Sequence, residues 1–75
     1  MIADFKVTVI SHSEPEGVQI LMPASNKAQL LQSVMTSIRN GHPICGRVVD
    51  TGYVVVFNTD SINSVWIHEE DKNGK

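Results

Sequence analysis

Apolar and polar residues alternate along the first part of the chain, at residues 4–11, which read DFKVTVIS. The apolar residues fall at every second position, as Phe5, Val7 and Val9. This period of two is typical of a strand with one buried face. A turn is expected at 12–17, because HSEPEG contains a proline and a glycine. The next apolar segment, GVQILMP at 17–23, predicts a second strand that pairs with the first in an antiparallel hairpin.

The periodicity changes at residues 24–41, which read ASNKAQLLQSVMTSIRNG. The apolar positions recur with the spacing of one helix face: Leu30, Leu31, Val34, Met35 and Ile38. Asn26 can accept a hydrogen bond from the first helical turn, and Gln29 can reach back toward it as in a capping box. Gly41 suits a left-handed cap at the other end, and Pro43 prevents the helix from continuing.

Three further strand patterns follow the helix: ICGRVVD at 44–50, YVVVFN at 53–58 and SVWIHE at 64–69. YVVVF is apolar at every position, which predicts a strand in the centre of the sheet or at a subunit interface. The predicted order is ββαβββ, and the expected fold class is α+β, with an antiparallel sheet and one helix packed on one face. We expect a single domain at 1–68 and a frayed acidic and polar tail at 69–75.

The length of the chain, 75 residues, is sufficient for one small domain. A domain of this size buries only about 60% of the surface that its unfolded chain exposes, so its core is thin. Cys45 is the only cysteine and cannot form a disulfide within the chain, and no second histidine lies three or four residues from His12, His42 or His68. Association is the remaining way to stabilise a small domain. We therefore expect a homo-oligomer without a metal site or a cofactor.

Charge and hydropathy restrict the location and the partners of the protein. The first residues, MIADFKVTVIS, lack the basic start and the long apolar run of a signal peptide. No apolar stretch approaches the roughly 20 residues that cross a bilayer, so we expect a cytoplasmic protein without membrane contact. Six Lys and Arg residues stand against eight Asp and Glu residues. We expect no broad nucleic-acid surface, because such a surface requires a basic patch.

The segment HPICGR at 42–47 carries the thiol of Cys45 and the guanidinium group of Arg47. In a strand these side chains lie on one face, but a single glycine between them leaves no loop to surround a phosphate. VVDTG at 48–52 resembles the active-site signature of aspartic proteases, which implies a catalytic role for Asp50. The helix precedes this segment instead of following it, and Asp-Thr-Gly between valine-rich strands is typical of a hairpin turn. An enzyme that uses Cys45 or Asp50 is therefore an alternative, and we expect no catalytic residues.

Two sets of residues are candidates for binding. Arg39, His42 and Arg47 lie around the end of the predicted helix and are the candidates for contact with an anionic ligand. The candidates for partner contact are apolar and aromatic residues of the last two strands: Tyr53, Val55, Phe57 and Trp66. Tryptophan is enriched where proteins bind one another.

These features favour a small non-enzymatic binding or regulatory module. We expect it to act as an oligomer, by contact with a protein partner or by enclosing a compact ligand. The alternative is a sponge that sequesters an anionic small molecule such as a nucleotide, as some very small phage proteins do against bacterial defence.

Overall fold

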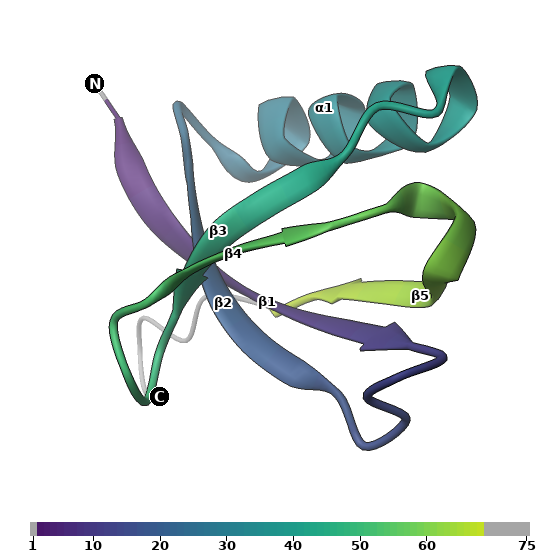
Figure 1. Ribbon diagram of the computed structural model, residues 1–75. Coiled ribbons are helices and arrows are strands. Elements are labelled where there is room, and N and C mark those ends of the chain that lie inside the picture. The colour runs from purple at the N-terminus through teal and green to yellow at the C-terminus, as the bar shows by residue number, and fades with distance from the viewer. Residues whose placement is uncertain (1, 69–75) are drawn as a thin grey trace.

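A computed structural model describes residues 2–68 of the chain as a five-stranded antiparallel sheet and one α-helix (Figure 1). In chain order the elements are β1 at Ala3–Ser11, β2 at Val18–Ala24, α1 at Lys27–Asn40, β3 at Ile44–Val48, β4 at Val54–Phe57, a short 3₁₀ helix η1 at Thr59–Ser61, and β5 at Ile62–Ile67. The predicted α+β class and the order ββαβββ are confirmed. The tail predicted at 69–75 lies outside the described residues.

The two ends of α1 are close to those that the sequence predicts. The Asn26 side chain accepts a hydrogen bond from the Gln29 N–H at 2.8 Å, as an N-cap does. Gln29 Oε1 accepts from the N–H of Ser25 at 2.6 Å, one residue before the N–H that a capping box uses. At the other end Gly41 has a φ of 73°, the left-handed conformation that ends many helices.

The strands lie in the order β4–β3–β2–β1–β5. β1 and β2 form the predicted antiparallel hairpin, with Val7 opposite Ile20. β4 lies at an edge, so the prediction of a central position for YVVVF is wrong. β4 is apolar on both faces, although within the described residues it pairs with β3 only.

β4 and β5 are consecutive in the chain but lie at opposite edges of the sheet. Residues 58–61 connect them, and such a segment spans at most about 18 Å. A flat sheet of this size would hold its two edges about 19 Å apart and would place the end of β4 and the start of β5 at opposite ends of the strands. The sheet is therefore strongly curled, and Figure 1 shows β4 passing through η1 directly into β5.

Gly46 allows β3 to approach β2 closely. A Cβ atom at this position would lie 2.8 Å from the carbonyl oxygen of Leu21 and 2.8 Å from Cδ1 of Ile20. Glycine inside a strand is typical of such a close approach or of a bend. In the sequence Gly46 is only a spacer between Cys45 and Arg47, because its packing role depends on β2, a strand that is distant in the chain.

The core is formed by buried side chains from the sheet and from α1: Val7, Val9, Ile20, Ala24, Leu30, Val34, Ile44 and Phe57. The helix contributes Leu30 and Val34 to this cluster. Ser11 is a buried polar residue, and its Oγ accepts a hydrogen bond from the Glu14 N–H at 3.2 Å in the turn after β1. The burial of Ser11 is therefore compensated locally.

Candidate interaction surface

Alternation along the strands divides the sheet into two faces. One carries the core, and we call the opposite one the outer face. Its members follow from the strand registers: Asp4, Lys6, Thr8 and Ile10 on β1; Gln19, Leu21 and Pro23 on β2; Cys45 and Arg47 on β3; Val54 and Val56 on β4; Ser64 and Trp66 on β5. None of them belongs to the buried core.

The part of the outer face on β3 and β4 combines apolar side chains with one positive charge. Val54 is 69% exposed and Val56 is 62% exposed. Val54 lies opposite Arg47 and Val56 lies opposite Cys45 in the antiparallel ladder. Exposed valines on a rigid strand are a feature of surfaces that associate.

The part on β1 and β5 is dominated by Trp66, which is 61% exposed. Its indole N–H donates a hydrogen bond to Ser64 Oγ at 3.0 Å, so its polar atom is satisfied within the strand while much of the ring surface stays accessible. Thr8 lies opposite Trp66, and its Oγ1 is 2.7 Å from Nε2 of His68 at the end of β5. The indole N–H, the Thr8 hydroxyl group and the His68 imidazole are thus all hydrogen-bonded to neighbouring side chains.

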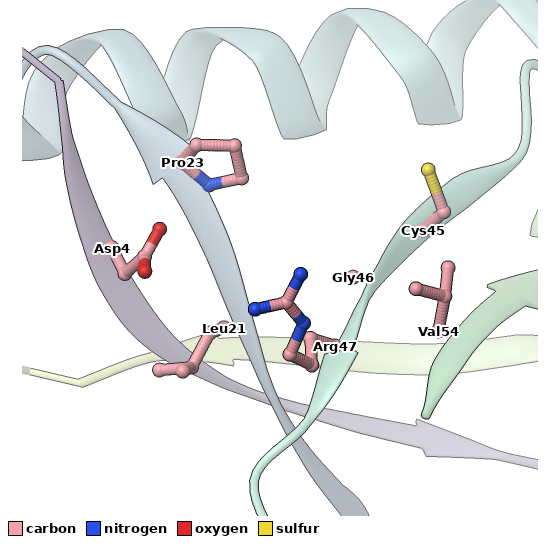
Figure 2. Close-up of a pocket in the computed structure, with 7 residues that line it drawn as sticks. All are labelled: Asp4, Leu21, Pro23, Cys45, Gly46, Arg47 and Val54. Atoms are coloured by element: carbon pink, nitrogen blue, oxygen red, sulfur yellow. The ribbon is translucent and has the colours of Figure 1, made fainter. Parts of the chain in front are cut away.

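A pocket of about 260 Å³ lies on the outer face (Figure 2). Its lining comes from β1, β2, β3 and the start of β4: Asp4, Leu21, Pro23, Cys45, Gly46, Arg47 and Val54. Figure 2 shows the Asp4 carboxylate at one side of the pocket and the Arg47 guanidinium group in its middle. The two charges are opposite, so the pocket offers a mixed polar and apolar site without a net charge.

Of the three predicted ligand-binding residues, only Arg47 lines the pocket of the outer face, whereas Arg39 and His42 are absent from its lining. Arg39 is exposed in the last turn of α1. His42 is exposed as well, and its backbone N–H donates to the Ser37 carbonyl at 2.9 Å in the helix cap. The histidine backbone therefore contributes to the end of the helix.

The four predicted partner residues divide between exposed and buried positions. Trp66 and Tyr53 are exposed, Tyr53 to 74%. Phe57 is only 8% exposed and Val55 is half-buried against the core, so the structure places these two on the core face. The exposed side chains of β4 are instead Val54 and Val56, which were not among the predicted partner residues. A large aromatic residue such as Phe57 is expected to face the core, and residues two positions apart in a strand share a face. Phe57 could therefore have predicted that Val55 faces the core and that Val54 and Val56 face outward.

The apolar stripe predicted along the helix is only partly buried. Leu30 and Val34 are in the core, whereas Leu31, Met35 and Ile38 are roughly half exposed. The spacing of these three residues places them along one side of the helix. This side of α1 is a second apolar surface, separate from the outer face.

The two candidate catalytic residues belong to different sites. Cys45 is exposed, has no disulfide partner and lines the pocket of the outer face. Asp50 lies in the turn between β3 and β4 and lines a second hollow beside Glu16 and Thr8. Within residues 2–68, no three His, Cys, Asp or Glu side chains are grouped closely enough to hold a metal ion.

Comparison with known proteins adds no relationship to these observations. No family model matches the chain, and no curated protein or solved structure is significantly similar to it. The helix at residues 27–40, the only one longer than a single turn in the described part of the chain, is too short and too polar to span a bilayer.

Proposed function

We propose that the protein is a small non-enzymatic binding or regulatory module that acts as an oligomer and contacts a protein partner through its outer face. The exposure of Val54, Val56 and Trp66 on strands of one sheet carries this proposal. Valine is restricted at χ1 and tryptophan has only two χ angles, so little side-chain entropy is lost when they bind. A surface tryptophan whose N–H is already satisfied by Ser64 needs no polar group from the partner.

The proposal includes three further features of the chain. The helix packs against the core face through Leu30 and Val34 and leaves the outer face open, which is supported by their membership of the core cluster. The protein acts in the cytoplasm, with Cys45 reduced. It performs no reaction, and the placement of Cys45 and Asp50 in separate hollows supports this.

Cross-linking in native cells, followed by mass spectrometry of the linked peptides, tests the binding surface. Trp66→Ser and Val54→Thr should each reduce capture of the partner by about tenfold, because truncating one interface anchor commonly costs more than 1 kcal/mol. Leu31→Gln, on the exposed side of α1, is the matched control and should leave capture unchanged. If capture depended on Leu31 and not on Trp66, the partner would bind the helix, and the proposal would be wrong.

A second candidate function is the enclosure of a compact ligand in the pocket of the outer face. The presence of both Asp4 and Arg47 in its lining favours a ligand that carries groups of both signs over a simple anion. Thermal unfolding in the presence of a panel of nucleotides and zwitterionic metabolites tests this function. A ligand that stabilises the protein should lose its effect in Arg47→Ala. Stabilisation by nucleotides that survives Asp4→Ala but not Arg47→Ala would favour the sponge for anions instead.

A further inference from the structure

The free edge of β4 has no strand partner within the described residues. β4 pairs with β3 on one side, and no ladder joins it to β5 or to another strand on the other side. An edge strand presents a row of backbone N–H and C=O groups that can pair with another strand. The side chains of β4 and the direction of its backbone groups determine what can pair there.

One hydrogen bond identifies the backbone groups that point outward. The Val48 N–H donates to the Tyr53 carbonyl at 2.7 Å, next to the ladder in which Gly46 lies opposite Val55. In an antiparallel ladder, alternate pairs exchange their hydrogen bonds and the residues between them turn their backbone groups away. Val55 therefore bonds to β3, whereas the N–H and C=O groups of Val54 and Val56 point to the free edge.

Charges, prolines and bulges, which commonly protect an edge strand, are absent from β4, which is short. No Lys, Arg, Asp or Glu occurs between Asp50 and Asp60, and the strand contains no proline. The ladder of β4 with β3 runs from Ile44 opposite Phe57 to Arg47 opposite Val54 without a register shift. Natural proteins usually place charges, prolines or bulges at such positions to prevent pairing.

We propose that β4 pairs with β4 of a second copy of this chain, in antiparallel orientation, with Val55 opposite Val55 at a two-fold axis. This inference rests on the oligomeric part of the proposed function and specifies its geometry. Val54 then lies opposite Val56 of the second copy, and each pair exchanges the backbone hydrogen bonds that are unused in one copy. The two five-stranded sheets join into one continuous sheet.

A second copy fits this edge because the outward backbone groups of β4 match those of an identical antiparallel strand. The outward donors and acceptors come from Val54 and Val56, which lie symmetrically on either side of Val55, so one antiparallel register uses all of them. In that register the valines of the two copies contact each other in cross-strand pairs on the outer face. Two-fold symmetry of this kind is the commonest arrangement of homo-oligomers.

The positive charges of the two copies do not oppose this arrangement. Arg47 lies on β3, so the two Arg47 side chains are separated by three strand spacings, or about 14 Å. This distance exceeds the Debye length at physiological ionic strength, which is about 8 Å. The centre of the interface contains valine side chains only, and Cys45 lies beside Val56 on its flank.

Sedimentation equilibrium of the full chain, together with two proline variants, tests the pairing. Val56→Pro removes an N–H that points to the free edge and that β3 does not use, and prolines are tolerated at such edge positions. We expect a dimer for the unmodified chain and a folded monomer for Val56→Pro, with at least a hundredfold weaker association. Val55→Pro is the matched control: it removes an N–H used by β3, and the ellipticity of the folded chain should fall.

Amide hydrogen exchange provides a readout that does not depend on a variant that folds. The Val54 and Val56 amides should become protected as the protein concentration rises. The outward amides of the other edge, at Val65 and Ile67, should exchange at the same rate at every concentration. A dimer in which Val54 and Val56 stay unprotected would overturn the inference and direct attention to the exposed side of α1.

The remaining outcomes separate this inference from the proposed function. A dimer that survives in folded Val56→Pro, or a closed ring of more than two copies, would refute β4–β4 pairing and leave the oligomeric module standing. A ring would require β4 to pair with β5 of the next copy. A monomer at all concentrations would refute both the pairing and the oligomeric part of the proposal, whereas the dependence of partner capture on Trp66 would still decide the binding surface.

Discussion

β4 and β5 are the two edge strands of the same sheet, yet their edges differ in chemistry. The outer side chains of β4 are Val54 and Val56, both largely exposed. Those of β5 are Ser64 and Trp66, which hydrogen-bond to each other. The ladder of β5 with β1 also contains a register shift next to Ser11, and a shift of this kind discourages pairing by a further strand.

This difference shows that edge position alone does not determine how a strand is used. β5 has a register shift at the end next to Ser11, which makes it the less suitable edge for pairing with a further strand. β4 is regular, apolar and open, so it is suited to continue the sheet into a second molecule. Substitutions in and around the two strands can separate what each contributes to the fold from what it contributes to association.

The largest effect is expected within β4 itself, from Phe57→Ala. Phe57 is 8% exposed and packs in the core, and removing a buried phenylalanine ring costs about 3–5 kcal/mol. Tyr53→Ala, at a position that is 74% exposed, should change the free energy of unfolding by less than about 0.5 kcal/mol. Urea unfolding followed by circular dichroism measures both. Equal losses would contradict the assignment of the two residues to the core and to the surface.

The next effect is expected at Gly46, which positions β3 and therefore β4. Gly46→Ala should lower the free energy of unfolding by about 2 kcal/mol, because the new Cβ would lie 2.8 Å from the Leu21 carbonyl oxygen. Gly52→Ala is the comparison, since nothing lies within 4 Å of its Cβ position and only its φ of 77° resists substitution. That backbone penalty is about 1 kcal/mol. A larger loss at Gly52 than at Gly46 would show that the approach of β3 to β2 is not tight.

The smallest effect is expected at the end of β5, from His68→Ala. The substitution removes the exposed hydrogen bond between His68 and Thr8 Oγ1 and should cost about 0.5 kcal/mol. Thr8→Val removes the same bond from the other side, so the double variant should cost little more than either single variant. Hydrogen exchange of the amide at position 68, which donates to the Lys6 carbonyl at 3.1 Å, should accelerate in both variants, with no change in the association of the chain. Additive losses would mean that the two side chains do not interact.

Several local features follow from neighbours within a few residues and were predictable from the sequence. The hairpin of β1 and β2 follows from alternating residues around a proline and glycine turn, and the caps of α1 follow from Asn26 and Gly41. Gly52 takes a positive φ of 77°, as expected for the Asp-Thr-Gly turn. The alternation at the last strand also placed Trp66 on the face opposite to Val65, where the structure has it.

The candidate site was predicted only in part. Trp66 and Tyr53, which were predicted to contact a partner, are exposed. Val55 and Phe57 lie on the core side of β4, and Val54 and Val56 are its outward side chains. A strand of four apolar residues carries no alternation of its own, so its orientation depends on the core that it meets. Arg39 and Arg47 are close in the chain, but the strand after the helix carries Arg47 to the outer face.

The sequence by itself determined the helix, the turns and the strand segments, because these depend on backbone preferences and side chains that act over a few residues. Only the tertiary structure decided which strands form the edges, which valines face outward and where Gly46 is required. These properties arise when segments distant in the chain pair and the sheet curls, and no local pattern carries that information.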